Sequence, residues 1–100
     1  MVNCIACTSK HPVRLGTICR LALGNEEIYT LYRCPDCKKY FLDCYEDIFM
    51  PVDDLPDPQW KRGPFDEANG ELLLRMIKEC PDPLDKYCDC AAHERFFMEI

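Results

Sequence analysis

The stretch that decides the fold is LYRCPDCKKYFL, residues 31–42. It places Cys34 and Cys37 between two runs of strand-forming residues. Two cysteines at this spacing fold into a tight turn, a knuckle, which presents both sulfurs to one metal ion. The stretch therefore predicts a strand that ends at a metal-binding knuckle and a second strand that follows directly.

A second pair with the same spacing lies near the start of the chain, where Cys4 and Cys7 flank Ile5 and Ala6. Two knuckles together supply four thiolates, which complete the tetrahedron that Zn²⁺ prefers. Four thiolates can also hold an iron–sulfur cluster, and free or redox-active thiols are the remaining alternative. We therefore predict a metal site, site 1, made of Cys4, Cys7, Cys34 and Cys37.

Strand-like runs occupy residues 17–23, 28–33 and 39–45, with Gly24 and Asn25 marking a turn between the first two. Strands and knuckles in this order resemble the zinc ribbon, a generic zinc-binding domain. The resemblance covers residues 1–46 and implies a three-stranded antiparallel sheet. Zinc ribbons often carry glycine after the second cysteine of a knuckle, whereas this chain has Thr8 and Lys38. We expect both residues to adopt a positive φ at some cost.

Residues 47–65 predict an extended surface connector. Its prolines, Pro51, Pro56, Pro58 and Pro64, interrupt any helix or central strand. Trp60 and Phe65 are expected to pack on the core.

Residues 66–100 predict two helices joined by a loop. Asp66 or Asn69 can cap the first helix, and Pro81 ends it. The second helix is expected to begin near Asp89 as N-cap. The apolar stripe of the first helix consists of Leu73, Met76, Ile77 and Cys80.

A second group of metal-ligating residues falls on the helix ends and on the loop between them. Three thiolates and one imidazole form the Cys₃His ligand set of a structural zinc site. The alternatives are that Cys80 only fills the core and that Cys88 and Cys90 form a redox pair. We predict this site, site 2, to consist of Cys80, Cys88, Cys90 and His93.

Cys19, Cys44 and His11 are also potential ligands. We interpret both cysteines as buried thiols that behave as small hydrophobic residues, and His11 as a solvated loop residue. Cys44 is the residue that would most readily replace an assigned ligand.

The chain has 100 residues and nine cysteines, an odd number for a disulfide framework. It shows no secretory leader pattern and no apolar run of membrane-spanning length. These features predict a cytoplasmic α+β protein with two zinc ions. Its expected parts are a zinc-ribbon lobe (1–46), a connector (47–65) and a metal-stapled helix–loop–helix (66–100).

The sequence favours a non-enzymatic protein. Both sites can be closed by four ligands, whereas a catalytic zinc keeps one open position. The catalytic motifs GxSxG and HExxH and a glycine-rich phosphate loop are absent.

The net charge of −6 is unevenly distributed, with +3 in residues 1–42 and −9 in residues 43–100. We therefore expect a protein partner that is basic where it meets residues 66–99. No membrane partner is expected.

Two other functions stay open, a thiol or zinc redox sensor and a nucleic-acid adaptor. The adaptor would combine basic side chains for phosphate contact with aromatic rings for base stacking. These side chains are Arg14, Arg20, Arg33, Lys38 and Lys39 with Tyr29, Tyr32, Tyr40 and Phe41.

Overall fold

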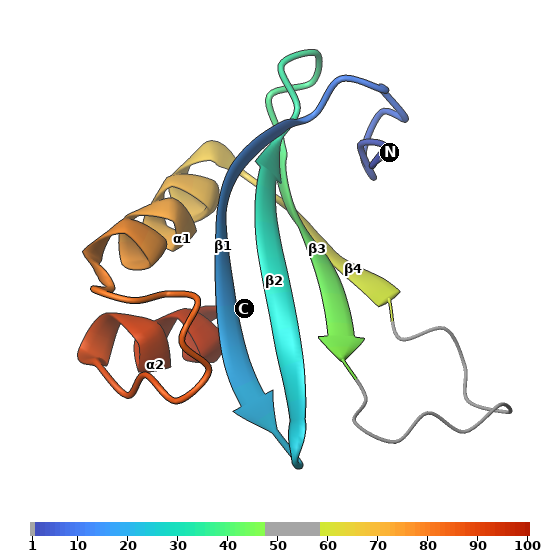
Figure 1. Cartoon of the computed structure of the whole chain (residues 1–100). Helices are drawn as coiled ribbons and strands as arrows, with labels where there is room; N and C mark the ends of the chain where they lie inside the picture. The colour runs from blue at the N-terminus through green and yellow to red at the C-terminus, as the bar shows by residue number, and fades with distance from the viewer. Residues whose placement is uncertain (1, 48–58) are drawn as a thin grey trace, which may run out of the picture.

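The computed structural model describes residues 2–47 and 59–100, which form a four-stranded antiparallel sheet with two helices against one face (Figure 1). The strands follow one another in the order β1-β2-β3-β4, so each pairs with its neighbour in the sequence. Their bounds are β1 Val13–Ala22, β2 Asn25–Arg33, β3 Tyr40–Asp47 and β4 Gln59–Phe65; those of the helices are α1 Glu67–Glu79 and α2 Ala91–Glu99. The predicted α+β class is confirmed, but the prediction of three strands is wrong.

The additional strand, β4, lies in the segment predicted to be a connector. It pairs with β3 through Cys44↔Trp60 and Tyr40↔Phe65. Pro64 does not prevent this pairing, because β4 lies at the edge of the sheet, where a missing backbone donor is tolerated. Residues 48–58, which include Pro51, Pro56 and Pro58, lie outside the described part of the chain.

The β1–β2 hairpin turns at Leu23 and Gly24, which both have positive φ, at 52° and 83°. Two consecutive positive φ values match the right-handed twist of the flanking strands, which is why this turn type is common in hairpins. The expected hairpin is present, with Ala22 paired to Asn25 across the turn.

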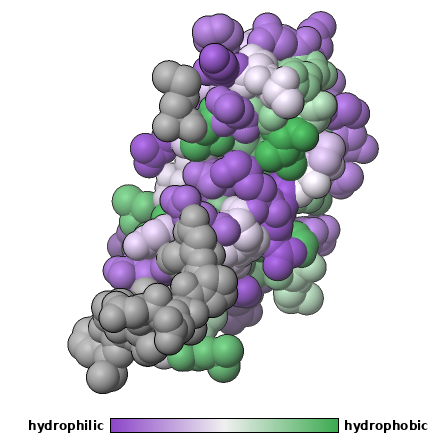
Figure 2. All heavy atoms as spheres, turned by 90° about the vertical axis from the view of Figure 1, so that its right-hand side faces the viewer, coloured by the Kyte–Doolittle hydropathy of each residue, from purple (hydrophilic) through white to green (hydrophobic). Residues whose placement is uncertain are grey.

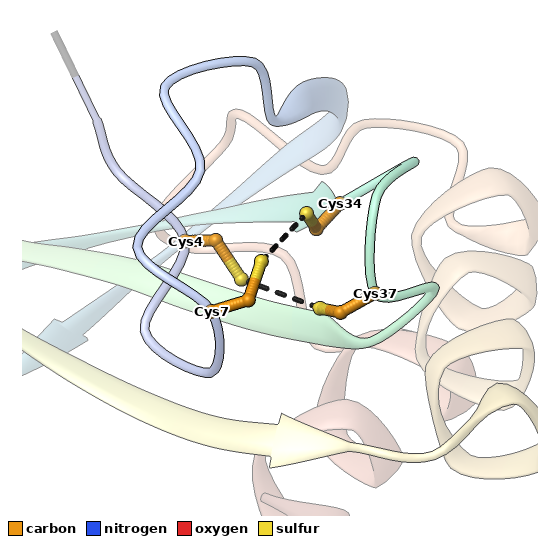
Figure 3. A group of neighbouring side chains, drawn as sticks. All are labelled: Cys4, Cys7, Cys34 and Cys37. Atoms are coloured by element: carbon orange, nitrogen blue, oxygen red, sulfur yellow. Dashed lines mark hydrogen bonds between the residues drawn. The ribbon is translucent and has the colours of Figure 1, made fainter.

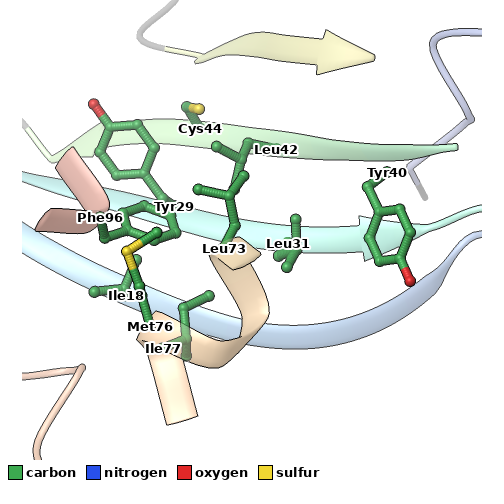
Figure 4. Packing of buried hydrophobic residues seen from close by; sticks show 10 residues of the cluster. All are labelled: Ile18, Tyr29, Leu31, Tyr40, Leu42, Cys44, Leu73, Met76, Ile77 and Phe96. Atoms are coloured by element: carbon green, nitrogen blue, oxygen red, sulfur yellow. The ribbon is translucent and has the colours of Figure 1, made fainter. Parts of the chain in front are cut away.

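The main core lies between the sheet and the helices (Figure 4). Ile18 pairs with Tyr29, and Tyr29 with Cys44, so their side chains project from the same face of three neighbouring strands. Both helices contribute to this cluster, so residues from the two predicted lobes share one core. Its buried members are Ile18, Tyr29, Leu31, Tyr40, Leu42, Cys44, Leu73, Met76, Ile77 and Phe96.

The ends of the helices follow local hydrogen bonding. Asp66 caps α1 by accepting a hydrogen bond from the N–H of Asn69 at 2.8 Å, and α1 ends at Cys80, directly before Pro81. The N-cap of α2 is Cys90, not Asp89 as predicted, because its sulfur accepts from the N–H of His93. Neither helix has the length and apolar composition that crossing a bilayer requires.

Gly70 lets α1 approach the sheet closely. A Cβ atom at this position would lie 2.1 Å from Cγ of Tyr40, far inside van der Waals contact. The Tyr40 ring has little room to move, because it is buried and its hydroxyl donates to Glu71. The glycine is therefore required by the packing of helix on sheet.

We expect Gly70→Ala to lower the free energy of unfolding by roughly 1–3 kcal/mol, although alanine is the better helix former. The overlap with the Tyr40 ring outweighs the gain in helix propensity. Urea unfolding of the variant measures this. Asn69→Ala, at the exposed neighbouring position, is the control and should change stability far less. A Gly70→Ala protein as stable as the original would contradict the close approach.

Candidate metal centres

The two knuckles of site 1 have the same backbone geometry. In each, the N–H of the first cysteine donates to the carbonyl five residues later, and its carbonyl accepts from the N–H four residues later. The bonds are Cys4 to Ser9 (2.9 Å), Thr8 to Cys4 (3.0 Å), Cys34 to Lys39 (2.9 Å) and Lys38 to Cys34 (2.8 Å). Each half of the site is thus held by local main-chain bonds.

The four sulfurs of site 1 converge on one point (Figure 3). All lie within 4.8 Å of one another, with Cys4 and Cys37 3.6 Å apart and Cys7 and Cys34 3.5 Å apart. Sulfurs around a tetrahedral zinc with bonds of about 2.3 Å would be separated by about 3.8 Å. A disulfide requires about 2.05 Å. The arrangement therefore fits a metal ion, and it brings together every residue predicted for this site.

The backbone also favours the thiolate that a metal needs. Removal from water raises the pKa of Cys34, but the backbone N–H groups of Cys37 and Asp36, together with the thiols of Cys7 and Cys37, lower it to about 6. The N–H of Ser9 lowers the pKa of Cys7, but desolvation and the neighbouring cysteines raise it to about 12. The backbone therefore favours the thiolate at Cys34 in particular.

A small apolar cluster attaches site 1 to the end of the sheet. Cys4 and Cys34 are buried against Phe41, and Phe41 stacks on Tyr32 at 5.4 Å between ring centroids. This cluster lies on the face of the sheet opposite to the helices, since Tyr32 and Phe41 alternate with the core residues of β2 and β3. Site 1 therefore has its own apolar support.

Thr8 and Lys38 both have a φ of 61°, which confirms the expected conformation after each knuckle. This region costs an ordinary L-residue about 1–2 kcal/mol, because Cβ approaches the carbonyl oxygen. The closure of the knuckle imposes the strain, since the N–H of Lys38 must reach the carbonyl of Cys34.

We expect Lys38→Gly to raise the unfolding free energy of the metal-loaded protein by roughly 0.5–1 kcal/mol, after allowing for the greater chain entropy of glycine. Urea unfolding measures the change. Lys38→Ala removes the same side chain but keeps Cβ, so it should bring no gain. Equal stability of the two variants would show that the backbone conformation carries no strain.

Site 2 brings together Cys80, Cys88 and His93, whose ligand atoms lie within 4.8 Å of one another. The sulfur of Cys80 is 3.6 Å from that of Cys88 and 3.4 Å from Nδ1 of His93. The three residues come from the end of α1, the following loop and the first turn of α2. Two sulfurs and an imidazole nitrogen are a donor set suited to zinc.

Cys90, the fourth predicted ligand, stands slightly apart. Its sulfur lies 3.5 Å from that of Cys80, but it does not join the group of three within 4.8 Å. The sulfur of Cys90 caps α2 by accepting a hydrogen bond from the N–H of His93. This bond lowers the pKa of Cys90. The structure therefore brings three of the four predicted ligands of site 2 together, with Cys90 beside Cys80.

The other ring nitrogen of His93 contacts the backbone of β1. Nε2 lies 2.6 Å from the carbonyl oxygen of Cys19, and the imidazole is buried. A carbonyl oxygen only accepts, so Nε2 carries the proton and Nδ1 keeps its lone pair for a metal. Metal-bound histidines commonly make such an outer hydrogen bond, which fixes the orientation of the ring. The sequence contains no signal for this contact, because the acceptor is a main-chain atom.

Cys19 and Cys44 are buried thiols, as predicted, and belong to neither group of potential ligands. Burial raises the pKa of Cys44 to about 12; burial together with the Glu26 carboxylate raises that of Cys19 to about 11. Both are therefore protonated at neutral pH. His11 is exposed, in agreement with its interpretation as a loop residue.

Comparisons of the chain with models of protein families, with curated proteins and with solved structures found no match.

Proposed function

We propose that this chain is a small non-enzymatic zinc protein that uses two structural zinc sites to present a surface to another protein. The observation that carries the proposal is the convergence of Cys4, Cys7, Cys34 and Cys37 at separations close to those around a tetrahedral zinc. Site 2 supports the same metal, because the histidine orients its free nitrogen toward the cysteine sulfur. An iron–sulfur cluster normally takes four cysteines, so the mixed ligands of site 2 favour zinc.

The non-enzymatic part of the proposal rests on ligand number. Site 1 offers four ligands, and we assign Cys90, whose sulfur lies 3.5 Å from that of Cys80, as the fourth ligand of site 2. A zinc ion with four protein ligands has no position left for water or substrate. A structural role also suits a small chain, because the free energy of metal binding contributes directly to folding.

A reducing compartment such as the cytoplasm is part of the same proposal. All nine cysteines are free thiols, and the eight proposed ligands include seven of them. Oxidation would remove these ligands, so the sites require conditions that keep thiols reduced.

We expect about two zinc ions per chain in protein purified without added metal, by elemental analysis. Cys37→Ser should lose one zinc and keep the other, because it removes a ligand from site 1 alone. Cys44→Ala is the control: it also removes a cysteine, but a buried one outside both sites, and should keep both ions. Iron with acid-labile sulfide, or a loss of zinc in the Cys44 variant, would contradict the assignment.

A protein partner is favoured by the surface of residues 66–100, which carry nine acidic and four basic side chains. All nine acidic residues are exposed. An acidic surface of this kind suits a basic partner recognised through charge complementarity. Figure 2 shows a different side of the molecule, the one away from the two helices, where hydrophilic side chains are interspersed with hydrophobic groups.

The nucleic-acid alternative loses support from the fold. Three of the four aromatic residues it would use for stacking, Tyr29, Tyr40 and Phe41, are at most 1% exposed. Arg20 forms an ion pair with Glu27, with 2.6 Å between Nε and Oε1, so its guanidinium is less available to bind a phosphate. The aromatic and basic residues therefore do not form one accessible binding face.

We expect negligible retention of the zinc-loaded protein on immobilised DNA or RNA near physiological salt, since retention depends on neutralising phosphates. With a protein partner, Asp89→Lys and Glu94→Lys should slow association more than they speed dissociation. Glu71 is less suitable for this test, because it accepts a hydrogen bond from Tyr40 and its reversal would disturb the fold. Salt-sensitive nucleic-acid binding that is lost in Arg33→Glu or Lys39→Glu would overturn the proposal.

A further inference from the structure

The outer edge of β1 is covered at one residue by the C-terminal part of the chain. In the sheet formed by the described residues, β1 is an edge strand, so its outward backbone groups face no further strand of that sheet. At Cys19 both groups are used: its N–H donates to the carbonyl of Pro83 at 2.8 Å, and its carbonyl accepts from Nε2 of His93 at 2.6 Å. In the sequence, the two residues that bind Cys19, Pro83 and His93, lie on either side of Cys88.

His93 therefore has two roles that lie on opposite sides of one ring. Nε2 holds the β1 backbone, and Nδ1 faces the sulfur of Cys80. The ring can make both contacts only in the tautomer with the proton on Nε2. Metal binding through Nδ1 selects that tautomer and fixes the ring plane, and it thereby strengthens the bond to Cys19.

The loop that carries Pro83 has little apolar packing of its own. Leu84 is 62% exposed and Tyr87 is 69% exposed. Lys86 in this loop lies 3.9 Å from the carboxylate of Glu26, and both side chains are partly exposed, so this ion pair contributes little to stability. By contrast, α2 is anchored in the core by Phe96, which is fully buried. Loss of the site 2 metal should thus release the loop and the His93 contact before the helix.

We propose that site 2 is a metal-dependent latch, in which His93 and the loop after α1 close over the outer edge of β1 only when the metal is bound. This inference rests on the proposed second zinc site. It adds that metal bound in site 2 controls whether the backbone of β1 at Cys19 is accessible. An uncovered edge strand exposes free N–H and carbonyl groups that can pair with an extended segment of another chain.

The test is amide hydrogen exchange, followed residue by residue by NMR in the full-length zinc-loaded protein. The Cys19 amide reports the latch. The amides of Ile18 and Arg20 report the sheet, because alternate residues of an antiparallel strand direct their N–H groups toward the partner strand. In Cys88→Ser, zinc content should fall by one ion and the Cys19 amide should exchange at least about tenfold faster, while Ile18 and Arg20 keep their protection.

Asp89→Ser is the matched control, since it changes the adjacent exposed residue and leaves every potential ligand in place. It should keep two zinc ions and the protection of Cys19. A Cys88→Ser protein with one zinc and an unchanged Cys19 amide would overturn the latch. Loss of protection at Ile18 and Arg20 as well would also overturn it, because the metal would then hold the whole sheet.

The ring nitrogens of His93 give an independent measurement. In the zinc-loaded protein, imidazole ¹⁵N spectra should show Nδ1 bound to metal and Nε2 protonated. Metal on Nε2 would contradict the latch, since the bond to Cys19 would be impossible. If the original protein holds only one zinc, in site 1, the two-site proposal itself fails; with two zinc ions bound, the same spectra test the latch alone.

Discussion

The antiparallel register between β1 and β2 is the constraint on which the rest of the structure depends. Pairing of Val13 with Arg33 places the chain before β1 beside the chain after β2, so the two knuckles of site 1 meet. The same register directs Ile18 and Tyr29 toward the helices. A shift by one residue would turn these side chains to the opposite face and separate the knuckles. One strand pairing thus sets both the main core and the first metal site.

The metal sites lie where the apolar clusters do not reach. Ten buried residues of the described chain form the main cluster between the helices and the sheet, whereas the described cluster at site 1 is smaller, with Phe41 buried beside Cys4 and Cys34. Site 2 joins the helices through a loop with exposed Leu84 and Tyr87. Structural zinc contributes about 10–16 kcal/mol in small domains, which is comparable with their whole stability. The potential ligands therefore lie near the ends of strands and helices, where packing in the main core contributes little to holding the chain in place.

The parts of the structure that could be predicted from the sequence are those that side-chain chemistry determines locally. Cysteine spacing predicted the grouping of site 1, and the resemblance to zinc-ribbon knuckles, which often have glycine after the second cysteine, predicted the positive φ of Thr8 and Lys38. β4 was not predicted, because Lys61, Arg62 and Pro64 are typical of loops as well as of edge strands. The N-cap of α2 was missed by one residue, since Cys90 caps through a sulfur that was considered only as a ligand. The contact of His93 with β1 was also missed, because any residue provides a carbonyl.

The separation of the contacting residues along the chain distinguishes the metal sites from the contact that His93 makes with β1. The potential ligands of site 1 lie within residues 4–37, and those of site 2 lie within residues 80–93. The link between His93 and Cys19, by contrast, joins residues 74 positions apart, and the sheet must already be in place for His93 to find its acceptor. Under the proposed latch, metal bound within a short C-terminal segment would therefore act on a strand that is distant in the sequence.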